Sequence, residues 1–211
     1  MADYKDYGYD NSEATHAHQY IAKPILGLLN YAKNKTILDL GCGNGALVKY
    51  LVQHNYDAFG TDASESGIKI ASKFSKSRFA LQDLTEDHLP QQFDQLTFDT
   101  IISTEVIEHL YDPKKFIDFC KDILLKNGGG EIILSTPYHG YLKNLSLAIM
   151  GKWDKHADPL WDGGHIKLWS KNTLSRLLTQ NGFIVTDFVG CGRLPYLWKS
   201  MVIKAKIQSG A

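Results

Sequence analysis

The run from residue 36 to residue 48 constrains the fold of this chain more than any other segment. A short apolar stretch, 35–40, is followed by glycines at every second position, Gly41, Gly43 and Gly45. Glycines in such a turn let the backbone bend sharply and let a ligand lie against main-chain amides that a Cβ would block. A helical pattern begins directly after them, so the run predicts a strand, a ligand-binding turn and a helix in that order.

The next acidic residue along the chain indicates which ligand this turn binds. Asp62 ends the following apolar stretch, about 20 residues after the glycines, where nucleotide-binding sheets hydrogen-bond a ribose diol. The third glycine of the dinucleotide fingerprint and the lysine of a phosphate-binding P-loop are both missing. Asp39, just before the first glycine, would repel a pyrophosphate but suits a ligand with a cationic amine. These features predict a site for a nucleoside rather than a dinucleotide.

Apolar and helical patterns alternate along the rest of the chain. The expected strands are 35–40, 58–61, 79–81, 98–103, 131–135, 183–190 and a last one within 198–207 that returns antiparallel. The expected helices are 46–54, 64–74, 113–125 and 171–180, with an N-terminal helix over 13–32 that Pro24 breaks or kinks. This alternation predicts an α/β fold with a Rossmann-like, seven-stranded, mostly parallel sheet and helices on both faces.

A single domain over residues 1–211 is expected, with two segments outside the alternation. Residues 1–32 are expected to form an N-terminal helical lid. Residues 137–169 are too long for an ordinary loop, and 138–150 have helical spacing, so we expect a helical insertion that covers the site and shapes a substrate pocket. The alternative is a surface excursion without a role in binding.

Composition excludes several classes of protein. Lys and Arg balance Asp and Glu, and the pI is near 7.1, so no nucleic-acid partner is expected. Three distant cysteines, no signal-peptide pattern and no long apolar run favour a cytoplasmic protein, a monomer or a homodimer. Membrane contact, if any, would be peripheral, through the helix expected at 138–150.

A second group of polar residues follows the strand expected to end at Ser103. Glu105 and Glu108 are three positions apart and His109 is four from Glu105, so one helical turn would place all three on one face. Two carboxylates and an imidazole can bind a divalent metal, orient a substrate hydroxyl or supply a general base. His165, just before the last expected helix, is a second candidate at the same rim, whereas His139 and His156 are expected to be exposed.

Two of these patterns resemble a known family. Asp39-x-Gly41-x-Gly43-x-Gly45 resembles motif I of the class I S-adenosylmethionine (SAM) methyltransferases. Glu105-Val-Ile-Glu-His109 resembles the ubiquinone-biosynthesis O-methyltransferases, which methylate catechol-like rings. The resemblance spans residues 36–140 closely and the C-terminal third loosely. It implies SAM as the cofactor and S-adenosyl-L-homocysteine (SAH) as the product.

The resemblance also implies roles for individual residues. Asp62 would bind the ribose hydroxyls, Asp83 the adenine amino group, and Ser103 and Thr104 the methionyl region. The expected cofactor-binding residues are Asp39, Gly41, Cys42, Gly43, Asn44, Gly45, Asp62, Ala63, Asp83, Leu84, Ser103 and Thr104. Glu105, Glu108 and His109 would hold Mg²⁺, which lowers the pKa of a bound phenol. Glu108, His109 and His165 are the expected catalytic residues, with either histidine as the base.

The sequence therefore favours a SAM-dependent methyltransferase (EC 2.1.1.-) that methylates a hydroxyl oxygen of a phenolic or catechol-like small molecule. An N- or C-methyltransferase without a metal is the alternative among enzymes, and a non-catalytic SAM-binding partner subunit is the alternative of another class. The resembled enzymes have a basic residue before motif I that contacts the cofactor. This chain has no Arg before Arg78, which leaves Lys23 or a tyrosine of the N-terminal segment for that position.

Overall fold

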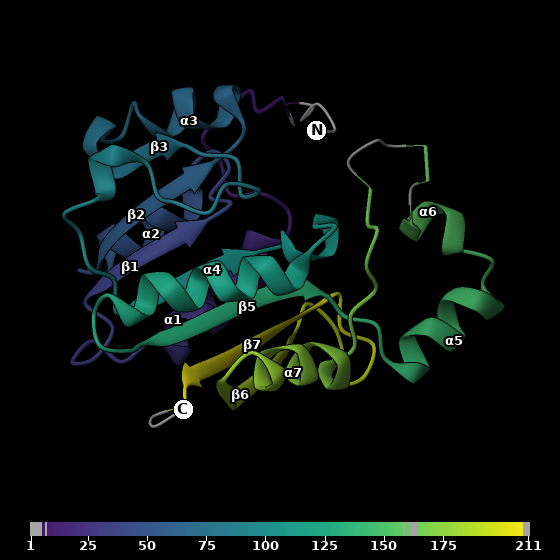
Figure 1. Cartoon of the computed structure of the whole chain (residues 1–211). Helices are drawn as coiled ribbons and strands as arrows, with labels where there is room; N and C mark the ends of the chain where they lie inside the picture. The colour runs from purple at the N-terminus through teal and green to yellow at the C-terminus, as the bar shows by residue number, and fades with distance from the viewer. Residues whose placement is uncertain (1–5, 7, 158, 161–163, 209–211) are drawn as a thin grey trace.

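A computed structural model describes residues 6, 8–157, 159–160 and 164–208 of the chain. Seven strands form one sheet in the order β3-β2-β1-β4-β5-β7-β6 (Figure 1). The strands are β1 (Thr36–Leu40), β2 (Asp57–Asp62), β3 (Phe79–Leu81), β4 (Thr100–Thr104), β5 (Glu131–Pro137), β6 (Phe183–Cys191) and β7 (Ser200–Ile207). Neighbouring strands from β3 to β5 are parallel, and β7 is antiparallel to β5 and β6. The expected fold class is confirmed.

Helices cover both faces of this sheet. The helices are α1 (His18–Leu28), α2 (Ala46–Gln53), α3 (Glu65–Ala71), α4 (Pro113–Leu125), α5 (Tyr141–Ile149), α6 (Trp153–Ala157) and α7 (Lys171–Gln180), with short 3-10 turns η1 (Lys76–Arg78), η2 (Gln91–Phe93) and η3 (Ile107–His109). One core lies between the sheet and α4 and α7, and the other lies between the sheet and α1, α2 and α3. In Figure 1, α4 and α7 lie in front of the sheet and α1 behind it.

Alternating side chains of the central strands divide between these two cores. Leu38 and Leu40 of β1 pack in the core that contains Phe116 of α4, whereas Ile37 packs in the core that contains Ile25 of α1. Successive residues of a strand point to opposite faces, so a strand buried on both sides has to be apolar throughout. Asp39 is the charged exception in β1, and it lies near the carboxyl end of the strand, where the cofactor is expected.

The N-terminal helix is shorter than expected and is not broken. α1 begins at His18 and continues through Pro24 to Leu28. Proline removes one helical hydrogen bond, but Ile21 and Ile25 on the same helix are fully buried against the sheet. Burial of a large aliphatic side chain contributes roughly 2 kcal/mol, so this packing keeps the helix continuous.

The insertion between β5 and α7 stands away from the sheet. Figure 1 shows α5 and α6 beyond the edge of the main body, joined to it through the end of β5 and the segment before α7. The helix expected at 138–150 is present as α5, and the short helix α6 was not expected. Among the described residues, no helix combines the length and the apolar character needed to cross a bilayer.

Because β1 to β5 are parallel, their carboxyl ends meet at one edge of the sheet. The glycine run follows β1, Ala63 follows β2, Asp83 follows β3, and Glu105 follows β4. This edge brings most of the expected site residues into one region.

Candidate functional site

The glycine run forms a tight turn between β1 and α2. Gly41, Gly43 and Gly45 all have positive φ, at 83°, 54° and 76°. The amides of Gly41 and Cys42 donate to the Thr61 carbonyl of β2, which ties the turn to the neighbouring strand. Side chains rarely adopt such φ values, and a Cβ on Gly41 would overlap Val106. Glycine is therefore required by conformation as well as by space.

Asp62 organises the turn from the end of β2. Its Oδ2 accepts a hydrogen bond from the Gly43 amide at 2.7 Å, and its Oδ1 accepts one from the Ser64 amide at 2.8 Å. Burial raises the pKa of Asp62, and these two backbone donors partly oppose that shift. The carboxylate thus sits beside the glycines with its position fixed, as a ribose-binding residue would.

Asp39 is fully buried in the central strand, between Gly60 of β2 and Ile102 of β4. Neither carboxylate oxygen has a hydrogen-bond partner among the described residues. Burial, with a smaller contribution from the charge of Asp62, raises the pKa of Asp39 to about 8. A buried carboxyl group without donors is costly, so this side chain suits a ligand that brings a cationic amine or hydrogen-bond donors.

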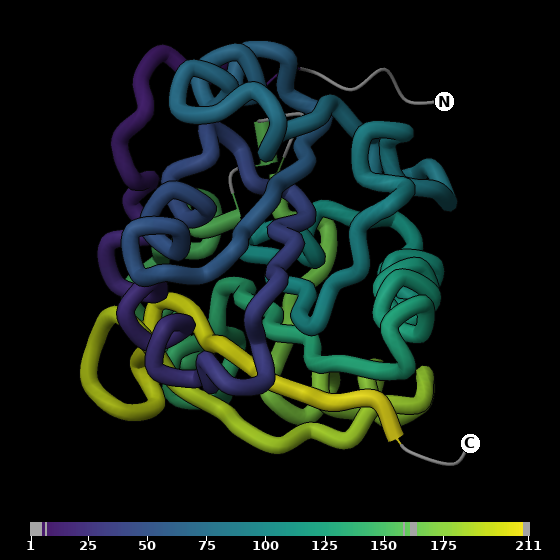
Figure 2. The backbone as a smooth tube through the Cα atoms, turned by 90° about the vertical axis from the view of Figure 1, so that its left-hand side faces the viewer, coloured from purple at the N-terminus to yellow at the C-terminus, as the bar shows by residue number. Residues whose placement is uncertain are grey.

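The N-terminal segment crosses the mouth of this turn. The Tyr9 ring lies against Gly43, whose Cβ would overlap it, and the Tyr9 amide donates to Ser66 Oγ at 2.9 Å. Asn44 donates to the carbonyls of residues 11 and 13, which fixes the segment over the glycine run. Figure 2 shows this purple segment beside the blue chain that contains α3. Of the two candidates to replace the missing arginine, Tyr9 lies at the turn, whereas Lys23 is exposed on α1.

The other expected cofactor residues lie along the same edge. Asp83 is exposed, and its Oδ1 accepts from the Thr85 amide, while Ala63 and Leu84 are partly buried. Ser103 is buried and donates to the Leu40 carbonyl at 2.7 Å. These residues surround the ends of β1 to β4, where a nucleoside would lie.

Sequence reasoning missed His18. Its Nε2 lies 3.1 Å from Thr104 Oγ1, and its Nδ1 has no hydrogen-bond partner among the described residues. His18 is 86 positions from Thr104, so no local pattern could have paired them. Burial lowers the pKa of His18 to about 4.

This lowered pKa predicts a pH-dependent loss of stability. Between the ordinary pKa of 6.5 and about 4, the unfolded chain binds a proton at His18 that the folded chain does not. The free energy of unfolding should therefore decrease as the pH falls through this window, by about 3 kcal/mol from this residue. Urea unfolding at several pH values should show that, as the pH falls, the free energy of unfolding decreases less in His18→Gln than in the wild type. His54 is exposed, and His54→Gln should show the same pH dependence as the wild type. The same pH dependence in His18→Gln as in the wild type would contradict the prediction.

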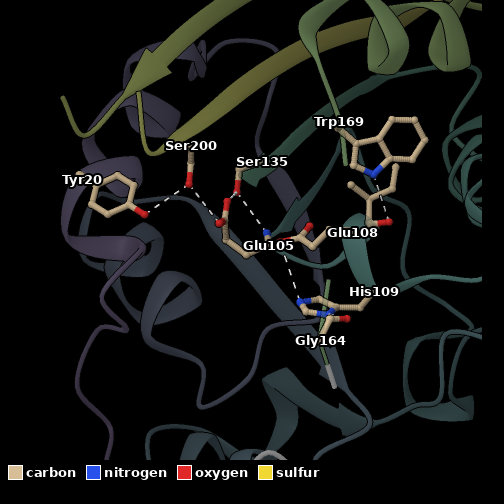
Figure 3. A network of polar contacts seen from close by, with 9 residues as sticks. Tyr20, Glu105, Glu108, His109, Ser135, Gly164, Trp169 and Ser200 are labelled. Atoms are coloured by element: carbon tan, nitrogen blue, oxygen red, sulfur yellow. Dashed lines mark hydrogen bonds and ion pairs between the residues drawn. The ribbon is translucent and has the colours of Figure 1, made fainter. Parts of the chain in front are cut away.

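The acidic group after β4 is arranged differently from the expected single helical face. Glu105 has a positive φ of 54°, and the turn that follows is a short 3-10 turn, η3. The Glu105 carboxylate accepts hydrogen bonds from Ser135 Oγ at 2.8 Å and Ser200 Oγ at 3.1 Å (Figure 3). Burial raises its pKa. The carboxylate of Glu105 is thus held toward β5 and β7. Glu105 does not belong to one helical turn with Glu108 and His109, although its charge still acts on Glu108.

Glu108, His109 and His165 come together instead. One ligand atom from each lies within 4.8 Å of the others, and the rings of the two histidines are 5.1 Å apart. His109 Nδ1 lies 3.2 Å from the Gly164 carbonyl, and the Glu108 carbonyl accepts from the amides of residues 166 and 167. The backbone that enters α7 is therefore held against η3, and this places His165 beside His109.

Glu108 is the most buried member of this group. Its carboxylate forms no hydrogen bond of good geometry with the described residues, although the Thr136 hydroxyl is close enough to lower its pKa slightly. Burial, followed by the negative charge of Glu105, raises the Glu108 pKa well above its ordinary value. Burial and the neighbouring His109 lower the pKa of His165 to about 4. A buried acid and a neutral imidazole side by side can exchange protons with a bound hydroxyl.

This donor set does not fit Mg²⁺. Magnesium prefers oxygen ligands, but Glu105 is already hydrogen-bonded to two serines and the remaining group offers one carboxylate and two imidazoles. One carboxylate with two imidazoles is a set typical of Zn²⁺ or Fe²⁺. No step of the chemistry is therefore assigned to Mg²⁺.

Two further histidines of the insertion were expected to be exposed, but the structure buries them wholly or in part. His139 follows β5 and is buried, and His156 on α6 is partly buried. Their Nε2 atoms are 3.3 Å apart. They lie 17 positions apart without a metal-like spacing, so the sequence contained no signal for this pair.

A family model described as a methyltransferase domain matches residues 14–187 of the chain. The ubiquinone biosynthesis O-methyltransferase of Dinoroseobacter shibae is 31% identical over 169 residues, which cover 76% of this chain and 64% of the relative. The enzyme of that name from Chelativorans sp. is 32% identical over 171 residues, which cover 80% of this chain and 64% of the relative. The match thus spans less than two thirds of the length of these relatives.

Solved structures share the fold. The magnesium protoporphyrin IX methyltransferase of Synechocystis PCC 6803, with bound SAH, superposes with a TM-score of 0.66 at 19% identity, covering 96% of this chain and 91% of that one. An S-adenosylmethionine-dependent methyltransferase from Mesorhizobium loti gives 0.64 at 18% identity, covering 87% and 96%. At these identities the likeness establishes the architecture alone.

Proposed function

This chain belongs to the methyltransferase domain family, and on that premise we propose that it transfers the methyl group of SAM to a hydroxyl oxygen of a phenolic or catechol-like small molecule. The proposal is supported by the curated relatives, which are named as O-methyltransferases. The observation that carries it is the group Glu108, His109 and His165 at the carboxyl end of β4, the strand next to the one that carries the glycine turn.

The residues at the turn fit the cofactor. The three glycines give the turn its positive φ angles, and the unpartnered Asp39 carboxyl group would gain a hydrogen-bond partner in a cationic amine. Asp62 would accept hydrogen bonds from the ribose hydroxyls, and Asp83 would accept one from the adenine amino group. When bound, SAM would supply an electrophilic methyl group: the O–CH3 bond to the acceptor forms in line with the S–CH3 bond that breaks, and SAH is the leaving group. The turn would therefore fix the position of the methyl group relative to the acceptor.

The acceptor would be bound and deprotonated on the η3 side. His109 and His165 are the candidate bases, because a neutral imidazole nitrogen can accept the proton of a phenol. Glu108 would hydrogen-bond the hydroxyl from inside the protein and exchange a proton with it. The insertion, 137–169, would cover this side and exclude water, which strengthens these polar contacts.

Two measurements test the proposal in sequence. Calorimetric titration with SAM and SAH should give micromolar binding, and NAD, the control, should not bind. Production of SAH should then be followed with catechol, phenol and, as a matched nitrogen acceptor, aniline. We expect turnover with catechol or phenol above that with aniline. Failure of SAM and SAH to bind would contradict the whole proposal, and turnover with aniline alone would contradict O-methylation.

A further inference from the structure

The insertion contains a pair of histidines outside the group assigned to the chemistry. His139 lies just after β5, and His156 lies on α6. Their rings are 5.0 Å apart between centroids, and their Nε2 atoms face each other at 3.3 Å. Trp153 packs beside both rings, at 6.2 Å from each. The pair is therefore partly shielded from water.

The separation of the two nitrogens matches a shared metal ion. Two nitrogen ligands at about 2.0–2.1 Å from a tetrahedral zinc ion lie about 3.3–3.4 Å from each other. His139 also has the outer contact typical of a metal-bound histidine, since its Nδ1 lies 3.2 Å from Asn144 Oδ1. An Nδ1–H donated to that oxygen leaves the lone pair on Nε2, which is the atom that faces His156.

We propose that His139 and His156, with His165 as a third ligand, bind a transition-metal ion of the Zn²⁺ class in the insertion. The ring of His165 is 6.3 Å from that of His156 between centroids, so a rotation of its side chain would complete a three-histidine set, with water in the fourth position. Imidazole nitrogens favour Zn²⁺ and related ions over Mg²⁺. The inference is carried by His139 and His156. His165, whose nitrogens lie with Glu108 and His109 in this structure, would be shared between the two sites.

Charges near the pair set the expected affinity. The ammonium group of Lys143, on α5, acts electrostatically on both histidines, so its positive charge would oppose a bound cation. We therefore expect micromolar rather than nanomolar binding of zinc.

A bound ion would fasten the insertion to the main body. The His139 amide donates to the Trp169 carbonyl, so His139 belongs to the base of the insertion, whereas His156 lies on α6 at its outer part. A metal bridge between them would hold α6 over the side of the site where the acceptor is expected. Protection of 152–157 from hydrogen exchange should accordingly increase when zinc is added.

The test uses the full chain without an affinity tag, after removal of metals by a chelator. Zn²⁺ is titrated calorimetrically, Mg²⁺ serves as the control ion, and the visible spectrum with Co²⁺ reports the ligand geometry. We expect one Zn²⁺ per chain and a tetrahedral Co²⁺ spectrum. His156→Ala should weaken Zn²⁺ binding by more than about 100-fold, a greater loss than the roughly 10- to 100-fold that removal of an outer partner causes. His156→Cys, which keeps a ligand, should retain Zn²⁺ binding. The exposed His88→Ala is the matched control.

Three outcomes would overturn the inference. The first is no Zn²⁺ binding by the wild type. The second is equal binding by the wild type and His156→Ala. The third is binding that is lost in Glu108→Gln but kept in His156→Ala, since this would place the ion at Glu108, His109 and His165 instead. A separate chelator-treated sample should keep its circular dichroism, so that loss of binding is not mistaken for loss of fold.

Discussion

Replacing Asp62 by alanine is expected to abolish measurable binding of SAM and SAH. The carboxylate accepts hydrogen bonds from the backbone amides of Gly43 and Ser64, which shapes the glycine turn. It also presents its oxygens at the place expected for a ribose. Each hydrogen bond to a charged group contributes about 1.5–3 kcal/mol. Loss of two such bonds to the cofactor would weaken binding by at least about 100-fold, which calorimetric titration would detect.

Two variants separate this role from a general effect on folding. Asp62→Asn keeps the shape and one acceptor oxygen, so its affinity should lie between those of the wild type and Asp62→Ala. Asp122→Ala, on the exposed side of α4, should bind SAH as the wild type does. Undiminished binding in a folded Asp62→Ala would remove Asp62 from the cofactor site.

Replacing Glu108 by glutamine is expected to leave SAH binding within a few-fold of the wild type and to lower kcat by about 10²- to 10⁴-fold. Glu108 lies next to His109 and His165. Burial raises its pKa, so glutamine matches the shape of the protonated acid and should preserve the fold. Steady-state kinetics with the best acceptor, together with SAH titration, would measure both effects.

Glu105→Gln is the matched control for this prediction. Glu105 belongs to the same sequence motif, but its carboxylate is held by Ser135 and Ser200. We expect Glu105→Gln to lower the midpoint of thermal unfolding and to keep kcat within a few-fold of the wild type. If Glu108→Gln turns over every accepted substrate at the wild-type rate, the role assigned to its group is wrong.

The local elements were predictable because their signals are contained within short stretches of sequence. Apolar runs gave the strands, helical spacing gave α4 and α7, and the glycines with Asp62 indicated a nucleoside site at the carboxyl edge. Parallel strands bring their carboxyl ends to one edge whatever their partners are, so the meeting of these residues follows from the alternation alone. The sequence by itself thus determined the fold class and the edge of the sheet at which the cofactor is expected.

The tertiary structure alone decided how the acidic and histidine side chains are paired. Spacing suggested one face for Glu105, Glu108 and His109, but spacing does not reveal that β5 and β7 flank this point. Ser135 and Ser200, 30 and 95 positions from Glu105, donate hydrogen bonds to its carboxylate and fix its position. Likewise His18 meets Thr104, and His139 meets His156, through contacts between elements. Sheet order differs from chain order, and each buried polar group therefore takes its partner from whichever element packs beside it.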